Sequence, residues 1–296
     1  MKEKEVKELL KKCRHKAEIP ITICAILINI LAVVLVIYVF NTDSENLFLF
    51  ELLSNVFNFE EYDIAIALAL GKYLLFFIIV FWIIGLIWML FTNIGIAMVD
   101  DIPLTEKVDS RLYGVYLDYC KKLGIKKIPK LFLAPNLDNI YSDGITIKSN
   151  KYVRIDNAAT DLAIIDNDWT NVEYEIAWEL AHIAYGHYSY WLLLLTVIAR
   201  WLPIIRSLYS RVMCYSADKL ASEIVGKENS IKALLMDYFM NKYEEKKVKD
   251  YIGYLYSEKQ NFIEKLSEMF TNLSKDMPSY KYRLQALLKD EDGKLL

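Results

Sequence analysis

The residues best suited to chemistry lie between residues 172 and 187, with the sequence VEYEIAWELAHIAYGH. If this stretch is a helix, side chains three, four and seven positions apart share a face, which brings Glu175, Glu179 and His182 together. Carboxylates and imidazoles are the groups that move protons and bind metal ions in proteins. The spacing therefore predicts a polar centre on one face of a helix.

Residues 178–182, WELAH, have the form of an H-E-x-x-H motif in which the first histidine is replaced. In the intact motif, two histidines four positions apart bind one zinc ion, and the glutamate is the general base for the attacking water. The indole nitrogen of Trp178 only donates hydrogen bonds, so it cannot bind a cation. The stretch predicts the scaffold of a metallopeptidase with a damaged metal site.

The remainder of the chain offers few replacement ligands. There are three histidines and four cysteines, and no C-x-x-C spacing that would indicate a disulfide framework or a thiolate zinc site. Because His187 lies five positions after His182, we assign it to a different helix face and to a structural role. Cys214 is interpreted as a small apolar filler, or as a thiolate nucleophile with His182 as its base.

Composition indicates membrane spans joined to a globular part. Hydrophobic residues make up 55% of the 296 residues, yet charged residues still make up 25%. Residues 19–40 are an apolar run long enough to cross the roughly 30 Å hydrocarbon core of a bilayer, and residues 73–98 are a second. Residues 1–101 are therefore predicted to be an N-terminal arm and a transmembrane helix pair. A net charge of -3 gives no reason to propose a nucleic-acid partner.

Charge around the two apolar runs predicts their orientation. Lysines and arginines flank the pair, whereas residues 41–62 carry acids and no lysine or arginine. The positive-inside rule places both ends of the pair in the cytoplasm. We expect a multi-pass protein of the cell (inner) membrane whose N-terminus and globular domain are cytoplasmic. A cleaved signal peptide fits poorly, because the first run is long and lacks an obvious small-residue cleavage site.

Residues 102–296 are predicted to be the globular domain. A helix over residues 110–123 and strands over 130–134, 145–147 and 152–155 indicate a small antiparallel sheet. Residues 166–171 supply Asp and Asn candidates for the N-cap of the central helix. Further helices are expected over 210–226, closed by a glycine, and in 231–273.

Residues 188–209 are hydrophobic but are interrupted by Arg200, Pro203 and Arg206. The longest clean apolar run within them is too short to span a bilayer by itself. A third span, a re-entrant hairpin and a membrane-facing amphipathic segment are all compatible with this pattern.

The order of these features resembles the HtpX-like membrane zinc metallopeptidases, which are related to the CAAX prenyl endopeptidases. The resemblance covers roughly residues 1–290 and is judged from the order of elements. Its motifs follow the transmembrane pair and read PKLFLAPNLDNIYSDG, WELAHIAYGH, a hydrophobic excursion, CYSADKLA and DMPSYKYRLQAL. It implies a mostly helical zincin-like (gluzincin) domain with a small β-sheet behind membrane α-helices.

Carried over to this chain, the zinc ligands of the family fall on Trp178, His182 and Cys214, with Glu179 as the general base. Trp178 replaces a histidine ligand, Cys214 replaces a glutamate ligand, and Met277 replaces the histidine of the closing motif. A catalytic zinc normally has three protein ligands and one open position. The resemblance therefore implies zinc as the cofactor, lost or weakly bound here, and a vestigial role for Glu179.

Two further residues take roles from the resemblance. Asp218, which would orient a metal ligand in the family, is expected to hydrogen-bond His182 and set its tautomer. Asn139 lies in the segment that resembles the substrate-binding edge of the family.

These interpretations predict an integral membrane pseudopeptidase that binds membrane-protein or peptide clients in a retained cleft. One alternative is an active membrane-bound zinc endopeptidase with a non-standard ligand set of His182 and Cys214, completed by Glu175 or Asp218. A second alternative is a cysteine-type hydrolase that uses Cys214 and His182.

Overall fold

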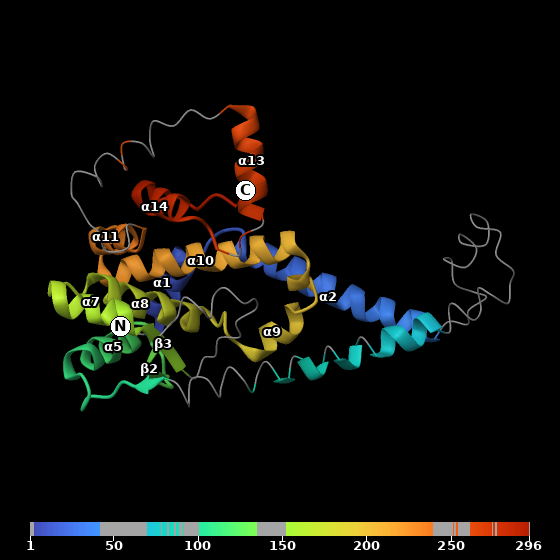
Figure 1. Cartoon of the computed structure of the whole chain (residues 1–296), viewed down its shortest axis with the longest axis horizontal. Helices are drawn as coiled ribbons and strands as arrows, with labels where there is room; N and C mark the ends of the chain where they lie inside the picture. Colours follow the sequence, from blue (N-terminus) through green and yellow to red (C-terminus); the bar gives the residue numbers. More distant parts are fainter. Residues whose placement is uncertain are drawn as a thin grey trace, which may run out of the picture.

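The structure is a computed structural model. It describes residues 3–41, 70–91 with gaps at 78, 82, 86, 89 and 90, then 101–134, 152–238, 251, 253, 261–273, 275 and 277–295. Within these residues the chain is mostly helical and contains one three-stranded sheet (Figure 1). The predicted helical class and small sheet are therefore confirmed, while the zincin-like domain remains a prediction.

One described helix is long and apolar enough to cross a membrane. After the short arm helix α1 (Glu3–Cys13), α2 runs over Glu18–Asn41, and its most apolar window has a mean hydropathy of 3.0. It begins inside the body of the protein and projects away from it (Figure 1). An apolar helix at Leu70–Gly85 falls short of the length of a span. Residues 42–69 and 92–100 lie outside the described residues, so the predicted helix pair and its orientation stay predictions.

The sheet consists of β1 (Ile102–Pro103), β2 (Lys130–Ala134) and β3 (Tyr152–Asp156), in that order. β1 pairs antiparallel with β2, but β2 and β3 are parallel, with Leu131 opposite Val153. The predicted antiparallel sheet is thus wrong for this second pair. The connection over residues 135–151 is longer than the roughly dozen residues that a parallel crossover needs. The predicted strand 145–147 and Asn139 lie in this connection, outside the described residues.

Helix α5 (Ser110–Lys122) confirms the prediction for residues 110–123. Asp109 is its N-cap, and the Oδ1 atom of Asp109 accepts a hydrogen bond from the Leu112 N–H at 2.9 Å. Leu112, Tyr116 and Tyr119 lie on one face and are buried. That face packs against the central helix of the molecule.

The centre of the molecule is the pair of helices α8 (Thr170–Tyr185) and α10 (Pro203–Val225), which pack along each other (Figure 1). Helix α11 (Lys227–Tyr238) packs on both, and α14 (Tyr280–Lys289) packs on α10 and α11. Helix α7 (Asn157–Asp166) and β3 cover another side of α8. α13 (Phe262–Leu273) contacts α10.

Both ends of α8 follow from local sequence. The predicted Asp or Asn N-cap is wrong, because Trp169 is the N-cap and makes no side-chain cap bond. Asp168, one residue earlier, accepts hydrogen bonds from the N–H and the hydroxyl of Thr170 at 3.1 and 2.7 Å. Gly186 ends the helix with a φ of 74°, a left-handed conformation that favours glycine. The helix therefore stops at Tyr185, two residues before the predicted end, and the chain turns back at Gly186.

The hydrophobic stretch after α8 forms α9 (Tyr190–Thr196) and the short 3₁₀ helix η2 (Ala199–Trp201), and α10 then begins at Pro203. Proline is favoured at the first position of a helix, where its missing N–H is not needed. Neither α9 nor η2 has the length of a membrane span.

Candidate functional site

Predicted site residues of α8 and α10, together with side chains from α2, α14 and the segment after α8, form two groups along the α8–α10 pair. We call the first group the ion-pair end: Tyr174, Trp178, Cys214, Asp218 and Arg283. We call the second group the histidine end: Glu18, Glu179, His182, His187, Tyr188 and Ser216.

At the ion-pair end, Arg283 of α14 holds Asp218 of α10 with two hydrogen bonds. Nε of Arg283 lies 2.9 Å from Oδ2 of Asp218, and Nη2 lies 2.7 Å from Oδ1. The Tyr174 hydroxyl donates to the same Oδ1 at 2.9 Å. Burial opposes the charge of Arg283, but the neighbouring Asp218 outweighs it and raises the pKa of Arg283 above its usual value. Both oxygens of Asp218 are thereby engaged in a buried ion pair.

Trp178 stands at the position that the family resemblance assigns to the first metal ligand. Its ring centroid is 4.3 Å from that of His182, in an edge-on arrangement, and the guanidinium carbon of Arg283 lies 5.6 Å from the indole centroid. The indole is buried. It therefore fills the space beside His182 with apolar bulk and links the two ends of the site.

Cys214 lies one turn before Asp218 on α10 and is 1% exposed. Its thiol donates to Oδ2 of Asp218 at 3.9 Å. Reactive thiolates are found in electropositive, partly exposed surroundings. Cys214 is instead buried beside a carboxylate, which is not such an environment. The expected bond from Asp218 to His182 is replaced here by bonds to Arg283, Tyr174 and Cys214.

At the histidine end, the two histidine rings meet. Nδ1 of His187 lies 2.8 Å from Nδ1 of His182, and Nε2 of His187 lies 3.3 Å from Oε1 of Glu18. The prediction that placed His187 on a different face is wrong, because the left-handed turn at Gly186 folds the chain back onto α8. A glycine directly before His187 is the sequence signal that could have indicated this turn.

The contacts of Glu18 define the tautomers of both rings. Glu18 also contacts Arg14, whose Nε is 3.2 Å from Oε1, and the Ser216 hydroxyl. Because an ionised carboxylate only accepts hydrogen bonds, Nε2 of His187 carries the hydrogen. Burial lowers the pKa of His187 and favours the neutral ring, so its Nδ1 accepts from the Nδ1–H of His182. The lone pair of His182 is then on Nε2.

Glu179, the predicted general base, is buried beside His182. The Tyr188 hydroxyl donates to Oε2 of Glu179 at 3.0 Å, and the Tyr188 ring stacks on the His182 ring with centroids 5.1 Å apart. The carboxylate is thus held in place by a residue that follows the Gly186 turn. Sequence reasoning did not single out Tyr188.

Glu175, one turn before Glu179, is surrounded by other acids. Burial raises the pKa of Glu175 to about 8, and the carboxylates of Asp237, Glu179 and Asp156 add to the effect. The backbone N–H of Asp156 donates to Oε1 of Glu175 at 3.4 Å, which joins α8 to the end of β3. At neutral pH most Glu175 side chains therefore carry a proton.

The described residues do not fit a three-ligand zinc site. Among them, no three His, Cys, Asp or Glu side chains are grouped as metal ligands would be. Trp178 fills one position that the resemblance assigns to a ligand, and Asp218, which accepts from the Cys214 thiol, is held by Arg283. Among the described residues, His182 supplies one oriented nitrogen, and a catalytic zinc normally takes three protein ligands.

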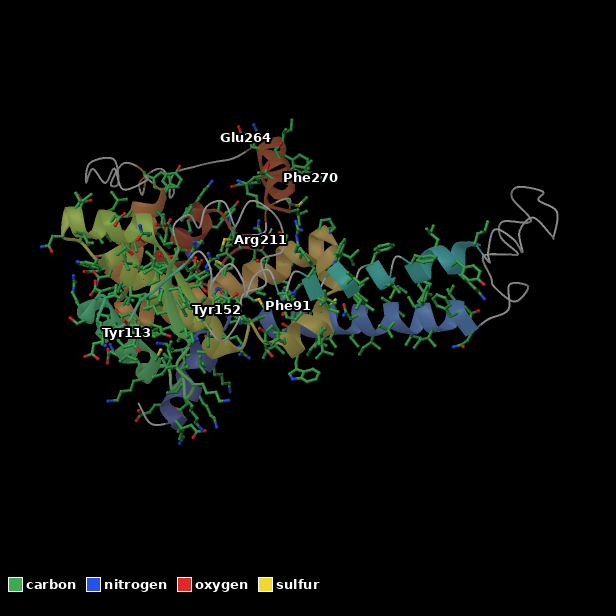
Figure 2. All side chains as sticks on the ribbon, turned by 60° about the horizontal axis from the view of Figure 1, so that its bottom comes forward. Phe91, Tyr113, Tyr152, Arg211, Glu264 and Phe270 are labelled. Atoms are coloured by element: carbon green, nitrogen blue, oxygen red, sulfur yellow. The ribbon has the colours of Figure 1, made fainter. Side chains whose placement is uncertain are left out.

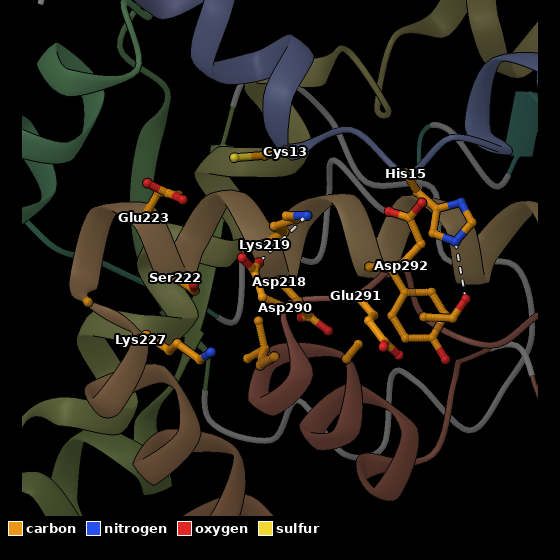
Figure 3. A pocket seen from close by; sticks show the side chains of 15 residues that line it. Cys13, His15, Asp218, Lys219, Ser222, Glu223, Lys227, Asp290, Glu291 and Asp292 are labelled. Carbon is orange, nitrogen blue, oxygen red and sulfur yellow. Dashed lines mark hydrogen bonds and ion pairs between the residues drawn. The ribbon is translucent and has the colours of Figure 1, made fainter.

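A cavity of about 340 Å³ lies between α10, α14 and the segment that follows α14. Figure 3 shows Asp218 and Lys219 of α10 facing Asp290, Glu291 and Asp292 across it. Neither Glu179 nor His182 lines this cavity. It is therefore distinct from the histidine end.

No protein-family model, curated protein or solved structure matches the chain. The family resemblance rests on the motifs quoted above.

Proposed function

We propose that the protein is a membrane-anchored pseudopeptidase, which binds an extended segment of a membrane-protein or peptide client without cleaving it through zinc. The observation that carries the proposal is the filling of the ligand positions at the ion-pair end. Trp178 packs on His182, and Cys214, at the other replaced ligand position, donates to Asp218. Hydrolysis by zinc would need these positions to hold metal ligands.

Client binding is proposed at the outer edge of β3. Among the described strands, β3 is the last in the order β1-β2-β3, and its final residue, Asp156, contacts Glu175 of α8. An extended peptide that adds to such an edge gains main-chain hydrogen bonds, and it would lie beside the α8 face that carries Glu175 and Glu179. Apolar helix α2 would hold this surface near membrane-embedded clients.

The first alternative is an active zinc endopeptidase that uses His182 and Cys214 with Glu175 or Asp218. It predicts about one bound zinc per chain and a loss of cleavage in Glu179→Gln. The engagement of Asp218 by Arg283, and of Glu175 by the backbone of Asp156, weighs against it.

The second alternative is a cysteine-type hydrolase. It predicts metal-independent alkylation of Cys214 and inactivation in Cys214→Ser. Cys214 is 1% exposed, and its thiol is directed to Asp218 rather than to an imidazole. Because Cys24 is exposed and will also react, alkylation has to be assigned to each cysteine by peptide mass spectrometry.

The activity test uses the full chain in detergent with unfolded casein as the probe. We expect no cleavage above background, with or without added zinc, and no difference between the wild type and Glu179→Gln. Cleavage that a chelator abolishes, and that Glu179→Gln lacks, would show an active metallopeptidase and overturn the proposal.

The binding surface is tested by placing a photo-crosslinking phenylalanine analogue at single positions. Tyr152 on β3 and Tyr113 on α5 are both half-buried tyrosines and occupy different elements (Figure 2). We expect casein to crosslink through position 152 and not through position 113. Equal crosslinking at both positions would contradict strand addition at β3.

A further inference from the structure

The hydrophobic stretch that follows the site folds as a hairpin against α2. α9 leads away from the site, η2 turns, and α10 returns. Both α9 and η2 pack against α2. The large apolar side chains that are exposed along this hairpin are Trp191, Leu194, Leu195, Trp201, Leu202 and Ile204.

A single polar residue of α2 holds the turn of the hairpin. The side-chain Nδ2 of Asn29 donates to the Leu194 carbonyl at 3.0 Å, and its Oδ1 accepts from the Ala199 N–H at 2.9 Å. The Thr196 hydroxyl donates to the Leu192 carbonyl at 2.7 Å. Irregular backbone inside a membrane needs such partners, because lipid offers none.

The position of Asn29 along α2 gives the depth of the turn. It lies ten residues after Ile19 and eleven before Phe40, the ends of the apolar run. At about 1.5 Å per residue, each half is about 15 Å long, and the bilayer core is about 30 Å thick. If α2 spans the bilayer, the turn bound to Asn29 lies near mid-depth.

We propose that residues 190–204 form a re-entrant hairpin that enters the bilayer to about half its depth beside α2 and presents its exposed apolar side chains to lipid acyl chains. The proposal rests on α2 spanning the membrane, as the proposed function requires. Of the three interpretations that the sequence allows for residues 188–209, the proposal selects the re-entrant hairpin.

Two features identify lipid as the occupant of this surface. The hairpin and α2 share a small apolar cluster around Ala25, Ala199 and Met213, so the exposed faces of both elements form one surface. The charge near the tip faces the protein, because the guanidinium carbon of Arg200 lies 4.5 Å from the ring centroid of buried Tyr209. Charged side chains at membrane depth are expected to face the protein interior in this way.

The test measures depth with nitroxide spin labels in the full chain, reconstituted in phosphatidylcholine nanodiscs. Native Cys24 is the exposed cysteine among the four and lies on α2, so it serves as the reference for the span. In a Cys24→Ala background, Leu195→Cys reports on the hairpin and Lys122→Cys on a partly exposed position of α5. Collision rates with oxygen, which enters lipid, and with a water-soluble nickel chelate are compared.

We expect the ratio of oxygen to nickel collisions to be several-fold higher at positions 24 and 195 than at position 122. If position 24 is lipid-exposed but position 195 resembles position 122, the hairpin proposal is overturned while the α2 span stands. If position 24 also resembles position 122, both the span and the hairpin fail. The variant Asn29→Leu should make the label at position 195 more mobile, and unchanged mobility and depth would contradict the role of Asn29.

Discussion

The two ends of the α8–α10 site are built from similar side chains but differ in what those side chains do. At the ion-pair end, a carboxylate, a thiol and a phenol are all directed to one another or to Arg283. At the histidine end, hydrogen bonds are donated in one direction, from His182 to His187 and from His187 to Glu18. The first arrangement joins three helices, and the second orients one nitrogen.

This difference separates stability from potential chemistry. A buried ion pair with both partners satisfied is costly to break by removing one of them. At the histidine end, the hydrogen-bonded chain of two buried imidazoles and a carboxylate leaves the lone pair of His182 on Nε2. A purely structural role does not require His182 to be held in one tautomer. We therefore expect substitutions at the ion-pair end to change stability, and those at the histidine end to change the state of His182.

The largest effect is expected at the ion-pair end. Asp218→Asn leaves the buried Arg283 charge without its counter-ion and should destabilise the protein by about 3–5 kcal/mol. The measurement is denaturant unfolding of the detergent-solubilised chain. The double variant Asp218→Asn, Arg283→Gln should lose less than the sum of the single variants, and additive losses would show that the pair is not coupled.

A smaller, pH-dependent effect is expected from Glu175. Its folded pKa of about 8 lies above its ordinary value of 4.5. Between these values the folded state keeps a proton that the unfolded state releases, so this group's contribution to stability falls as the pH rises from 4.5 to 8. In the wild type, this fall in the free energy of unfolding is on the order of a few kcal/mol at pH 8 and above. Glu175→Gln should remove it.

Unfolding free energies at pH 5, 6.5 and 8 would measure the slope. Glu173→Gln, on the same helix but partly exposed, is the matched control and should leave the slope close to that of the wild type. An unchanged slope in Glu175→Gln would mean that the carboxyl group titrates normally.

The smallest effect on stability is expected from Tyr188. Tyr188→Phe removes the hydrogen bond to Glu179 while it keeps the ring that stacks on His182. The expected loss in the free energy of unfolding is about 1 kcal/mol. In this variant, nitrogen NMR of the histidines should still show His182 with its hydrogen on Nδ1. In Glu18→Gln, by contrast, the tautomer of His182 should change. The same tautomer in both variants would contradict the chain through His187.

Local signals in the sequence predicted much of the fold. The bounds of β2 follow from a short apolar run between turn residues, and the end of α10 follows from Gly226, which has a φ of 100°. The parallel pairing of β3 was not predicted, because the direction of a strand pair depends on the path of the connection. Helix α7 was also missed, since its apolar residues show little one-sided periodicity.

The site was predicted in part. Residues on one helix, such as Glu175, Glu179 and His182, follow from helical spacing. Glu18 and Arg283 were missed because they come from α2 and α14, far along the chain, and only tertiary packing brings them to α8 and α10. His187 was misplaced because the helix was extended past Gly186.

The central claim is that the ion-pair end has replaced a metal site. Metal content of the detergent-purified protein, measured by mass spectrometry beside the variant Trp178→His, Cys214→Glu, tests it most directly. We expect the wild type to carry far less than one zinc per chain and the variant, which restores the ligand positions of the family pattern, to bind zinc. A wild type that already carries about one tightly bound zinc per chain, the content of a single catalytic site, would contradict the account.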